Sequence, residues 1–449
     1  MLQIKTAVRR HGMKTLGWVL LAAAMMQFAA CGGGDSPSPA PWSGTKQLGA
    51  AGATTGGFGV ATDAHGNVYV AGYTNGGLDG NTLTGTTDCL VTKYDSSGTK
   101  LFTRQLGVAS ANTGGYGVAT DADGNVYVTG ITFGGLDGNT LTGTIDFFVT
   151  KYDSSGTKLF TRQLGAAGAD TYGQSVATDA NGNVYVAGST YGGLDGNTLS
   201  GWVDFFVTKY DRSGTKLFTR QLGVAGATTS GQSVATDAHG NVYVAGETSD
   251  GLDGNTKNGS NDFFVTKYDS SGTKLFTRQL GITGADTIGK SVATDAHGNV
   301  YIAGWTNGGL DGNTLTGEAD FFVTKYDSSG TKLFTRQLGG VNAYAGGNSV
   351  ATDANGNVYV AGDTFGGLDG NTGTGVQDFF ITKFDSSGTK LFTRQLGVAG
   401  AHTIGVSVAT GADGNAFVAG YTNGGLDGNT LTGTYDFFVT KFDSSGTKQ

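Results

Sequence analysis

The sequence predicts an all-β fold: a single seven-bladed β-propeller over residues 42–449, with four antiparallel strands in each blade. Three observations predict it. Glycine makes up 81 of 449 residues and aromatic residues 10%, a composition that suits many short strands joined by tight turns. A 58-residue pattern recurs seven times. The strand missing from the last copy stands ahead of the first. The string GNVYVAG or a close variant begins at Gly66, Gly124, Gly182, Gly240, Gly298, Gly356 and Gly414.

One repeat shows the expected strands, which in order are 175–179 (SVATD), 184–187 (VYVA), 204–210 (DFFVTKY) and 215–222 (TKLFTRQL). Glycine-containing turns, ANGN and DRSG, separate the first pair and the second pair, as in hairpins. The first three strands are apolar on both faces, which indicates a sheet covered on both sides. The fourth carries Lys216 and Arg220, as an outer edge strand should. Four antiparallel strands per repeat are typical of a propeller blade.

The phase of the repeats favours a closed ring over an open solenoid. The chain ends at Gln449, where the seventh copy would begin its fourth strand. Residues 42–48 align with residues 100–106 by the 58-residue period and therefore supply that strand. A ring closed in this way removes two exposed strand edges, whereas a solenoid gives no reason for the arrangement.

Residues 1–30 are interpreted as a secretory signal peptide. Lys5, Arg9, Arg10 and Lys14 precede an apolar run at 16–28 that is short for a membrane-spanning helix. The sequence Phe-Ala-Ala-Cys at 28–31 resembles the lipobox of bacterial lipoproteins, with Phe28 where leucine is usual. That resemblance implies that Cys31 is diacylated and becomes the first residue, and residues 31–41 are then a Gly/Ser/Pro tether. The alternative is an ordinary signal peptide with an incidental cysteine.

The repeat pattern SVATD-xxGNVYVAG…DFFVTKYDSSGTKLFTRQLG resembles the bacterial β-propeller repeats called SBBP repeats, over about residues 42–449. The resemblance implies a propeller and a secreted or cell-surface location, and it brings no catalytic residues. Gly32, rather than Asp, after Cys31 implies outer-membrane sorting by resemblance to Gram-negative lipoproteins. The last copy departs from the pattern, because Gly411, Ala416 and Phe417 replace the usual Asp, Val and Tyr. We therefore expect less regular strands in the closing blade.

Charge and motif content exclude several function classes. The net charge is −8, and no basic cluster follows the leader, which argues against nucleic acid and against electrostatic docking on a membrane. CxxC, HExxH and Walker patterns are absent. We expect no cofactor and no catalytic residue. Cys89 stands where other repeats have Phe, so we expect a buried apolar thiol. His402 is alone in a loop, and the other mature histidines occupy a solvated turn position.

Two sets of aspartates recur with the period. The first set lies in the LDGNT loop, which resembles calcium loops but lacks the alternating ligands of an EF-hand, so tight-turn chemistry is favoured over a calcium site. Its members are Asp79, Asp137, Asp195, Asp253, Asp311, Asp369 and Asp427. The second set ends the first strand, and turn capping is favoured over a metal ring because Gly411 interrupts it. Its members are Asp63, Asp121, Asp179, Asp237, Asp295 and Asp353.

Variation among the copies concentrates just before the first strand, just after the second and just before the third. In an up-and-down blade these places share one end of the strands, so the variety falls on one face of the disc. The aromatic residues there are candidate ligand platforms. The candidates are Tyr73, Tyr172, Trp202, Trp305, Tyr421 and Tyr435.

These observations predict a monomeric, non-catalytic surface binding or scaffold protein for a protein or glycan, exported and lipid-anchored at the outer membrane or cell surface. One alternative is a polysaccharide lyase or hydrolase, which needs paired carboxylates. Glu247, Glu318 and Asp363 are the only varied acids on this face, and the blade spacing is expected to separate them. The other alternative is a structural repeat protein with no ligand.

Overall fold

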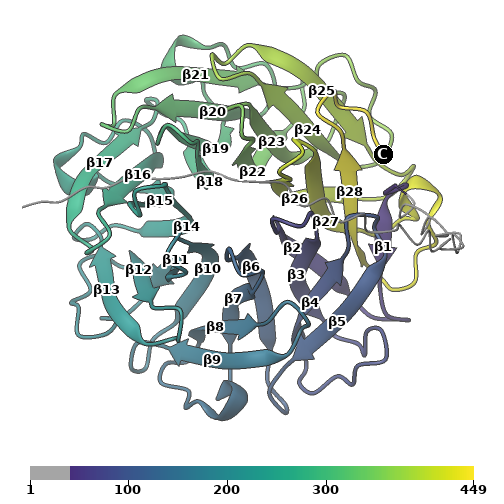
Figure 1. Ribbon diagram of the computed structural model, residues 1–449. Coiled ribbons are helices and arrows are strands. Elements are labelled where there is room, and N and C mark those ends of the chain that lie inside the picture. The colour runs from purple at the N-terminus through teal and green to yellow at the C-terminus, as the bar shows by residue number, and fades with distance from the viewer. Residues whose placement is uncertain (1–40) are drawn as a thin grey trace, which may run out of the picture. The chain divides into compact units, whose positions relative to one another are not determined.

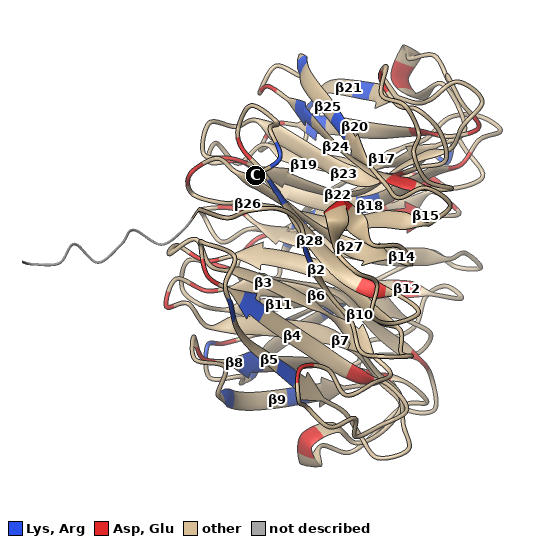
Figure 2. Ribbon diagram, turned by 90° about the vertical axis from the view of Figure 1, so that its right-hand side faces the viewer, with Lys and Arg blue, Asp and Glu red and all other residues tan. Residues whose placement is uncertain are grey.

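The computed structural model describes residues 41–449, which form seven four-stranded antiparallel sheets around a central axis (Figure 1). The predicted signal peptide, Cys31 and nearly all of the tether lie outside the described residues. In each blade the chain moves outward from the axis, strand by strand. Seen edge-on, many acidic residues lie in loops and at strand ends, while most Lys and Arg lie on strands (Figure 2). The seven-bladed fold predicted from the sequence is confirmed.

The strand bounds repeat with the 58-residue period. Blades 1 to 3 comprise β2 (Thr55–Thr62), β3 (Val68–Thr74), β4 (Asp88–Tyr94), β5 (Lys100–Leu106); β6 (Thr113–Thr120), β7 (Val126–Thr132), β8 (Asp146–Tyr152), β9 (Lys158–Leu164); β10 (Thr171–Thr178), β11 (Val184–Thr190), β12 (Asp204–Tyr210) and β13 (Lys216–Leu222). Blades 4 to 6 comprise β14 (Thr229–Thr236), β15 (Val242–Thr248), β16 (Asp262–Tyr268), β17 (Lys274–Leu280); β18 (Thr287–Thr294), β19 (Val300–Thr306), β20 (Asp320–Tyr326), β21 (Lys332–Leu338); β22 (Ala345–Thr352), β23 (Val358–Thr364), β24 (Asp378–Phe384) and β25 (Lys390–Leu396). Blade 7 comprises β26 (Thr403–Thr410), β27 (Ala416–Thr422), β28 (Asp436–Phe442) and β1 (Lys46–Leu48).

Helical structure in residues 41–449 is confined to four three-residue 3-10 turns inside the LDGNT loops: η1 (Leu136–Gly138), η2 (Leu252–Gly254), η3 (Leu310–Gly312) and η4 (Leu426–Gly428). None of the helical segments in this range is long and apolar enough to cross a membrane.

The core lies between neighbouring blades. Every residue of β11 and β12 is buried, and the phenylalanines of the third strands stack from blade to blade, as in Phe205 on Phe264 with ring centroids 4.9 Å apart. The innermost strands differ from expectation, because in β10 buried and partly exposed residues are mixed. Their inner face lines the central channel instead of packing on another sheet.

In blades 1 to 6 the aspartate that follows the innermost strand is a turn cap, as predicted. Asp179 Oδ1 accepts the backbone N–H groups of Asn181 and Asn183, both at 2.9 Å. Its Oδ2 accepts the amide of Asn183 at 2.7 Å and the hydroxyl of Tyr185 at 3.0 Å. The same bonds to the Asn and the Tyr recur at the other five aspartates of the set.

Blade 7 replaces this capping arrangement. Gly411 has no carboxylate to accept a tyrosine hydroxyl, and residue 417 is Phe, which has no hydroxyl to offer. Phe417 instead packs edge-on against Trp42, with ring centroids 5.4 Å apart. The expected loss of strand regularity is wrong, since β26 and β27 have the same lengths as their counterparts in other blades. The two substitutions compensate each other.

The LDGNT aspartates adopt left-handed backbone angles, with φ between 54° and 58°. In blades 1 to 6 each pairs with the lysine that begins the adjacent outer strand, and in blade 7 Asp427 pairs with Lys448 near the C-terminus. Asp195 with Lys216 is one such ion pair. Tight-turn chemistry thus accounts for these loops. Among residues 41–449, groups of three or more potential metal ligands are not found. Cys89 is buried, as expected, and burial raises the pKa of its thiol.

Closure of the ring by the N-terminal segment is confirmed. β1 pairs antiparallel with β28, from Lys46 opposite Val439 to Leu48 opposite Phe437. Trp42 is buried between Tyr94 and Phe417. A ring of threonines closes the disc near the axis, because each innermost strand donates a 2.8 Å hydrogen bond to the preceding one. The donors are Thr62, Thr120, Thr178, Thr236, Thr294, Thr352 and Thr410, and Thr62 donates back to Thr410.

Candidate binding site at the mouth of the central channel

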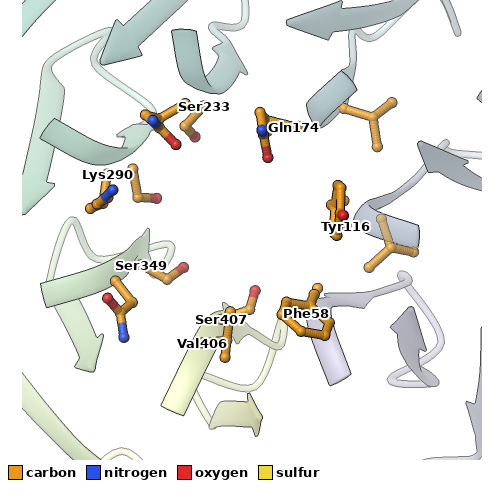
Figure 3. Close-up of a pocket in the computed structure, with 16 residues that line it drawn as sticks. Phe58, Tyr116, Gln174, Ser233, Lys290, Ser349, Val406 and Ser407 are labelled. Atoms are coloured by element: carbon orange, nitrogen blue, oxygen red, sulfur yellow. The ribbon is translucent and has the colours of Figure 1, made fainter. Parts of the chain in front are cut away.

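A β-bulge places one side chain from each blade in the central channel. In every innermost strand the pairing with the second strand skips one residue, such as Gln174 between Gly173 and Ser175. A bulged residue leaves the regular alternation and can be aimed independently of it. The seven bulged residues, called here the channel ring, all line one cavity of about 220 Å³ (Figure 3): Phe58, Tyr116, Gln174, Gln232, Lys290, Asn348 and Val406.

The residues that follow the channel ring fasten the innermost strands to one another. Ser233 Oγ, for example, accepts the backbone N–H of Val292 in the next blade at 3.2 Å, and four other serines make the equivalent bond. In blades 1 and 2 glycine takes this position, where a Cβ on Gly59 would lie 3.0 Å from the carbonyl oxygen of Tyr116. The channel ring therefore stands on a rigid base.

In blades 1, 4 and 6 the channel-ring residue contacts the residue fifteen positions later, near the end of the second strand. The pairs differ by blade. Phe58 stacks on Tyr73 in blade 1, with ring centroids 5.2 Å apart. Gln232 donates to Glu247 at 3.1 Å in blade 4, and Asn348 donates to Asp363 at 2.7 Å in blade 6. The same backbone thus carries different side-chain pairs around the channel.

Aromatic side chains gather on the side of blades 7, 1 and 2. Phe58 contacts Tyr421 and Tyr116 with ring centroids at 5.6 Å and 5.9 Å, and Tyr421 contacts Tyr435 at 5.7 Å. We call Phe58, Tyr73, Tyr116, Tyr421 and Tyr435 the aromatic cluster. Three of the six predicted platform residues, Tyr73, Tyr421 and Tyr435, therefore lie together, joined by Phe58.

The other three predicted platform residues lie apart from this cluster. Trp305 is partly buried and contacts Tyr344 at 6.1 Å. Tyr172 packs against Tyr191 at 6.0 Å, and Trp202 is 69% exposed. None of these three residues lines the channel or its mouth cavity.

Polar groups occupy the opposite side. Lys290 faces Tyr116 and Phe58 across the channel (Figure 3), and within residues 41–449 its ammonium enters no ion pair. It belongs to blade 5 and is flanked by the two amide–acid pairs of blades 4 and 6. This arrangement surrounds a single cation with amides and buried acids.

The blade 6 pair extends into a chain of four side chains. Asp363 also accepts a hydrogen bond from the amide of Gln377, whose oxygen lies 3.1 Å from Nδ1 of His402. Asp363 is 6% exposed, and burial raises the pKa of its carboxyl although both amides oppose the shift. The sequence-based expectation that His402 is alone is wrong, because Gln377 connects it to Asp363.

Among residues 41–449, Glu247 is the one residue with a fully buried side-chain polar atom that lacks a hydrogen-bond partner. Its Oε2 is buried and has no hydrogen-bond partner within residues 41–449. Burial raises the pKa of Glu247, and the nearby Lys290 opposes that rise. Leaving such an atom without a partner costs about 1–3 kcal/mol. A group that supplies the missing hydrogen is therefore favoured beside it.

A second cavity of about 410 Å³ lies at the mouth and shares five residues with the channel cavity: Phe58, Gln232, Lys290, Asn348 and Val406. We call it the mouth cavity. It is also lined by Asp363, Gln377, Ile404 and Tyr421. Its volume falls within the range of roughly 300–1,000 Å³ that is usual for small-molecule sites. Its walls combine the aromatic cluster with the polar side.

The sequence predicted variation just before the first strand of each blade, where Phe58, Tyr116, Gln174 and Lys290 lie, but these residues were not among the predicted site residues. It did not identify Gln232, Asn348 or Gln377. The available signal was their variation at repeat-equivalent positions. The bulge that directs the ring residues inward has no sequence mark of its own here.

The fold and the cavity define a seven-bladed propeller whose channel mouth has an aromatic side and a polar side. The chain matches the family described as "SBBP: Beta-propeller repeat" over 44–79, 101–136, 159–195, 217–253, 275–311, 333–369 and 391–427, more than half of its length. It therefore belongs to the SBBP β-propeller repeat family.

Two curated proteins resemble parts of the chain. "Regulatory protein FlaEY" of Caulobacter vibrioides is 30% identical over 247 residues, covering 48% of this chain and 26% of that protein. "Uncharacterized WD repeat-containing protein L264" of Acanthamoeba polyphaga mimivirus is 26% identical over 222 residues, covering 38% and 16%. The matched regions span about a quarter or less of these relatives.

Among solved structures, the WD40 β-propeller domain of Doa1 has a TM-score of 0.49 at 11% identity, covering 89% of this chain and 97% of that one. A protein of unknown function from Bacteroides caccae has a TM-score of 0.38 at 14% identity, covering 67% and 88%. Identities this low carry no function.

Proposed function

We propose that this propeller is a non-catalytic binding or scaffold module of the cell envelope, which holds a protein or glycan at the channel mouth. One observation carries the proposal: blades with matching strand bounds present different side chains to a single cavity. The fold does not require a particular side chain at these positions, because blades with the same strands carry different residues there. A relative named as a regulatory protein, rather than as an enzyme, is consistent with binding.

A hydrolase or lyase is the second candidate, favoured by the chain from Asp363 to His402. Two features weigh against it. Gln377 separates the acid from the imidazole, so the carboxylate does not orient His402 directly as it would in a catalytic triad. Glu247 and Asp363 are each held by an amide of their own blade. Turnover of a polysaccharide by the purified chain, lost in Asp363→Asn, would support this candidate instead.

The location is part of the proposal and is supported by the sequence alone. Cys31 is taken as the lipid-bearing residue, with residues 32–41 as a tether to the outer membrane or cell surface. Replacing Cys31 by Ser and fractionating cells tests this. The wild type should be in the membrane fraction and the variant in soluble fractions. A wild type already soluble would contradict the anchor.

The binding proposal is tested by retention of the full-length chain on purified cell envelopes. Tyr421→Ser alters the mouth cavity, and His297→Asn alters a turn on the opposite face with a residue that blades 3 and 6 carry there. Tyr421→Ser should reduce retention while His297→Asn leaves it unchanged. Equal retention of both variants and the wild type would favour a structural repeat protein with no ligand on this face.

A further inference from the structure

The hydrogen bonds already made within the mouth cavity determine what its polar groups can still offer. The Asn348 amide nitrogen donates to Asp363 and also to the carbonyl oxygen of Gly405, at 2.7 Å and 2.9 Å. The Gln232 amide nitrogen donates to Glu247. Because each nitrogen is held by an acid, the amide oxygens of Asn348 and Gln232 can accept hydrogen bonds from a ligand. The two acids thus orient the amides.

Lys290 supplies the opposite polarity between these two acceptors. Its ammonium has three hydrogens to donate and no ion-pair partner in the described residues. A ligand that satisfies this side must therefore both donate and accept hydrogen bonds at neighbouring atoms. Hydroxyl groups do both.

The aromatic cluster faces this polar side across the cavity. Phe58 and Tyr421 are common to the cavity wall and the cluster. Such rings favour a flat apolar surface. A pyranose ring combines a face of C–H groups with an edge of hydroxyls, which matches the two unlike walls.

Building on the proposed binding function, we propose that the mouth cavity holds one neutral sugar unit of a glycan. The C–H face of the sugar lies against Phe58 and Tyr421. Its hydroxyls donate to the amide oxygens of Gln232 and Asn348 and accept from Lys290. Glu247 lines neither cavity, and its part is to hold the amide nitrogen of Gln232.

An anionic sugar fits less well. Its carboxylate would pair with Lys290 but would also face two amide oxygens and the acids behind them, Glu247 and Asp363. Like charges and facing acceptors repel in a partly buried site. Neutral units should therefore bind better than uronic acids.

The test uses substitutions that the channel ring itself already contains. Phe58→Val copies blade 7, Lys290→Gln copies blades 3 and 4, and Gln174→Val is the matched control, because Gln174 lines the channel but not the mouth cavity. The full-length chain is titrated with neutral tetrasaccharides of glucose, galactose, mannose and N-acetylglucosamine, with tetragalacturonate and with an unrelated tetrapeptide set. Binding is measured by calorimetry and by saturation-transfer NMR.

We expect at least one neutral tetrasaccharide to bind, with affinity reduced about tenfold by Phe58→Val and about fivefold by Lys290→Gln, and unchanged by Gln174→Val. Melting curves confirm that the variants are folded. Binding of tetragalacturonate or peptides alone, or equal loss with Gln174→Val, would overturn the sugar assignment.

Protease-treated envelopes separate failure of this inference from failure of the proposed function. Retention that survives protease treatment and is reversed by the free tetrasaccharide supports the sugar. Retention lost on protease treatment leaves the binding function standing and refutes the glycan. Absence of any retention that depends on Tyr421 refutes the binding function itself.

Discussion

The two faces of the disc use the same backbone differently. On the turn face, the AxGN and DSSG turns repeat almost unchanged, and six of the seven AxGN turns are capped by an aspartate bonded to the same Asn and Tyr. On the mouth face, equivalent positions hold a stacked aromatic pair in blade 1 and amide–acid pairs in blades 4 and 6. The comparison teaches that stability is built by repetition on one face, which leaves the other free to vary.

Removing the segment that closes the ring should have the largest effect on the stability of the propeller. Deleting residues 42–48 removes β1 and the buried Trp42, and loss of a buried Trp side chain alone costs about 3–5 kcal/mol. The deletion also exposes the edge of β28, which invites aggregation. Thermal melting and light scattering measure both effects. Deleting 32–41, the predicted tether, is the control, and equal melting temperatures would contradict closure by β1.

On the turn face, Asp179→Ala should destabilise the protein by about 2–4 kcal/mol, because it leaves the buried Tyr185 hydroxyl and two backbone amides without their acceptor. Asp195→Asn is the matched change in an LDGNT loop. It removes only a partly exposed ion pair with Lys216, so we expect less than about 1 kcal/mol. Urea denaturation of both variants measures the difference, and similar losses would break the distinction between capping and surface pairing.

Blade 7 lacks the aspartate–tyrosine cap of the other blades, and two substitutions restore its residues. Phe417→Tyr alone should cost about 1–2 kcal/mol, because the new hydroxyl lacks the acceptor found in other blades. Adding Gly411→Asp should recover about 1 kcal/mol, since a Cβ there meets only the movable carboxylate of Asp413 at 2.6 Å. Chemical denaturation of the wild type, both single variants and the double variant gives the coupling. Strict additivity would show that the two substitutions are independent.

On the mouth face, Glu247→Gln should stabilise the protein near neutral pH by about 1 kcal/mol. The pKa of Glu247 is raised by burial, so the folded state holds its proton longer than the unfolded chain does. The contribution of Glu247 to the stability of the wild type is therefore fully present below the ordinary glutamate pKa. It is lost as pH rises through the raised pKa of Glu247 in the folded state. Melting temperatures of the two proteins should converge in acid and separate toward neutral pH. Parallel curves would contradict an ionisation at this site.

Trp305→Ala should change stability least, by about 1 kcal/mol or less, because the side chain is only partly buried and contacts one ring. If Trp305 takes part in partner binding, the same change should weaken binding by about 1–3 kcal/mol. His297→Ala, on the turn face, should alter neither quantity. Melting and binding are measured on the same preparations. Unfolding of Trp305→Ala with unchanged binding per folded molecule would place this residue in the core.

The sequence was sufficient for the blade number, strand order and ring closure, because periodicity and the phase of the termini carry them directly. It underestimated the innermost strand, which begins at Thr171 instead of Ser175, since Thr-Tyr-Gly has no apolar alternation yet pairs with the end of β11. The polar side was missed for a different reason. Asn348, Asp363, Gln377 and His402 are 14 to 25 residues from their partners, and they meet through strand pairing within blade 6 and a single β-bridge from Gln377 to His402 in blade 7.

The pairing of β1 with β28 determines how the ring responds to tension. The two strands are antiparallel, so the chain entering β1 and the chain leaving β28 depart from the same end of the pair. A force applied between these two segments peels the three paired residues apart one after another instead of shearing them together. The remaining six blades, each closed by its own seven-residue outer strand, do not lie between the two points of attachment. We therefore expect the β1–β28 pair to open at low force while the other six blades keep their strand pairing.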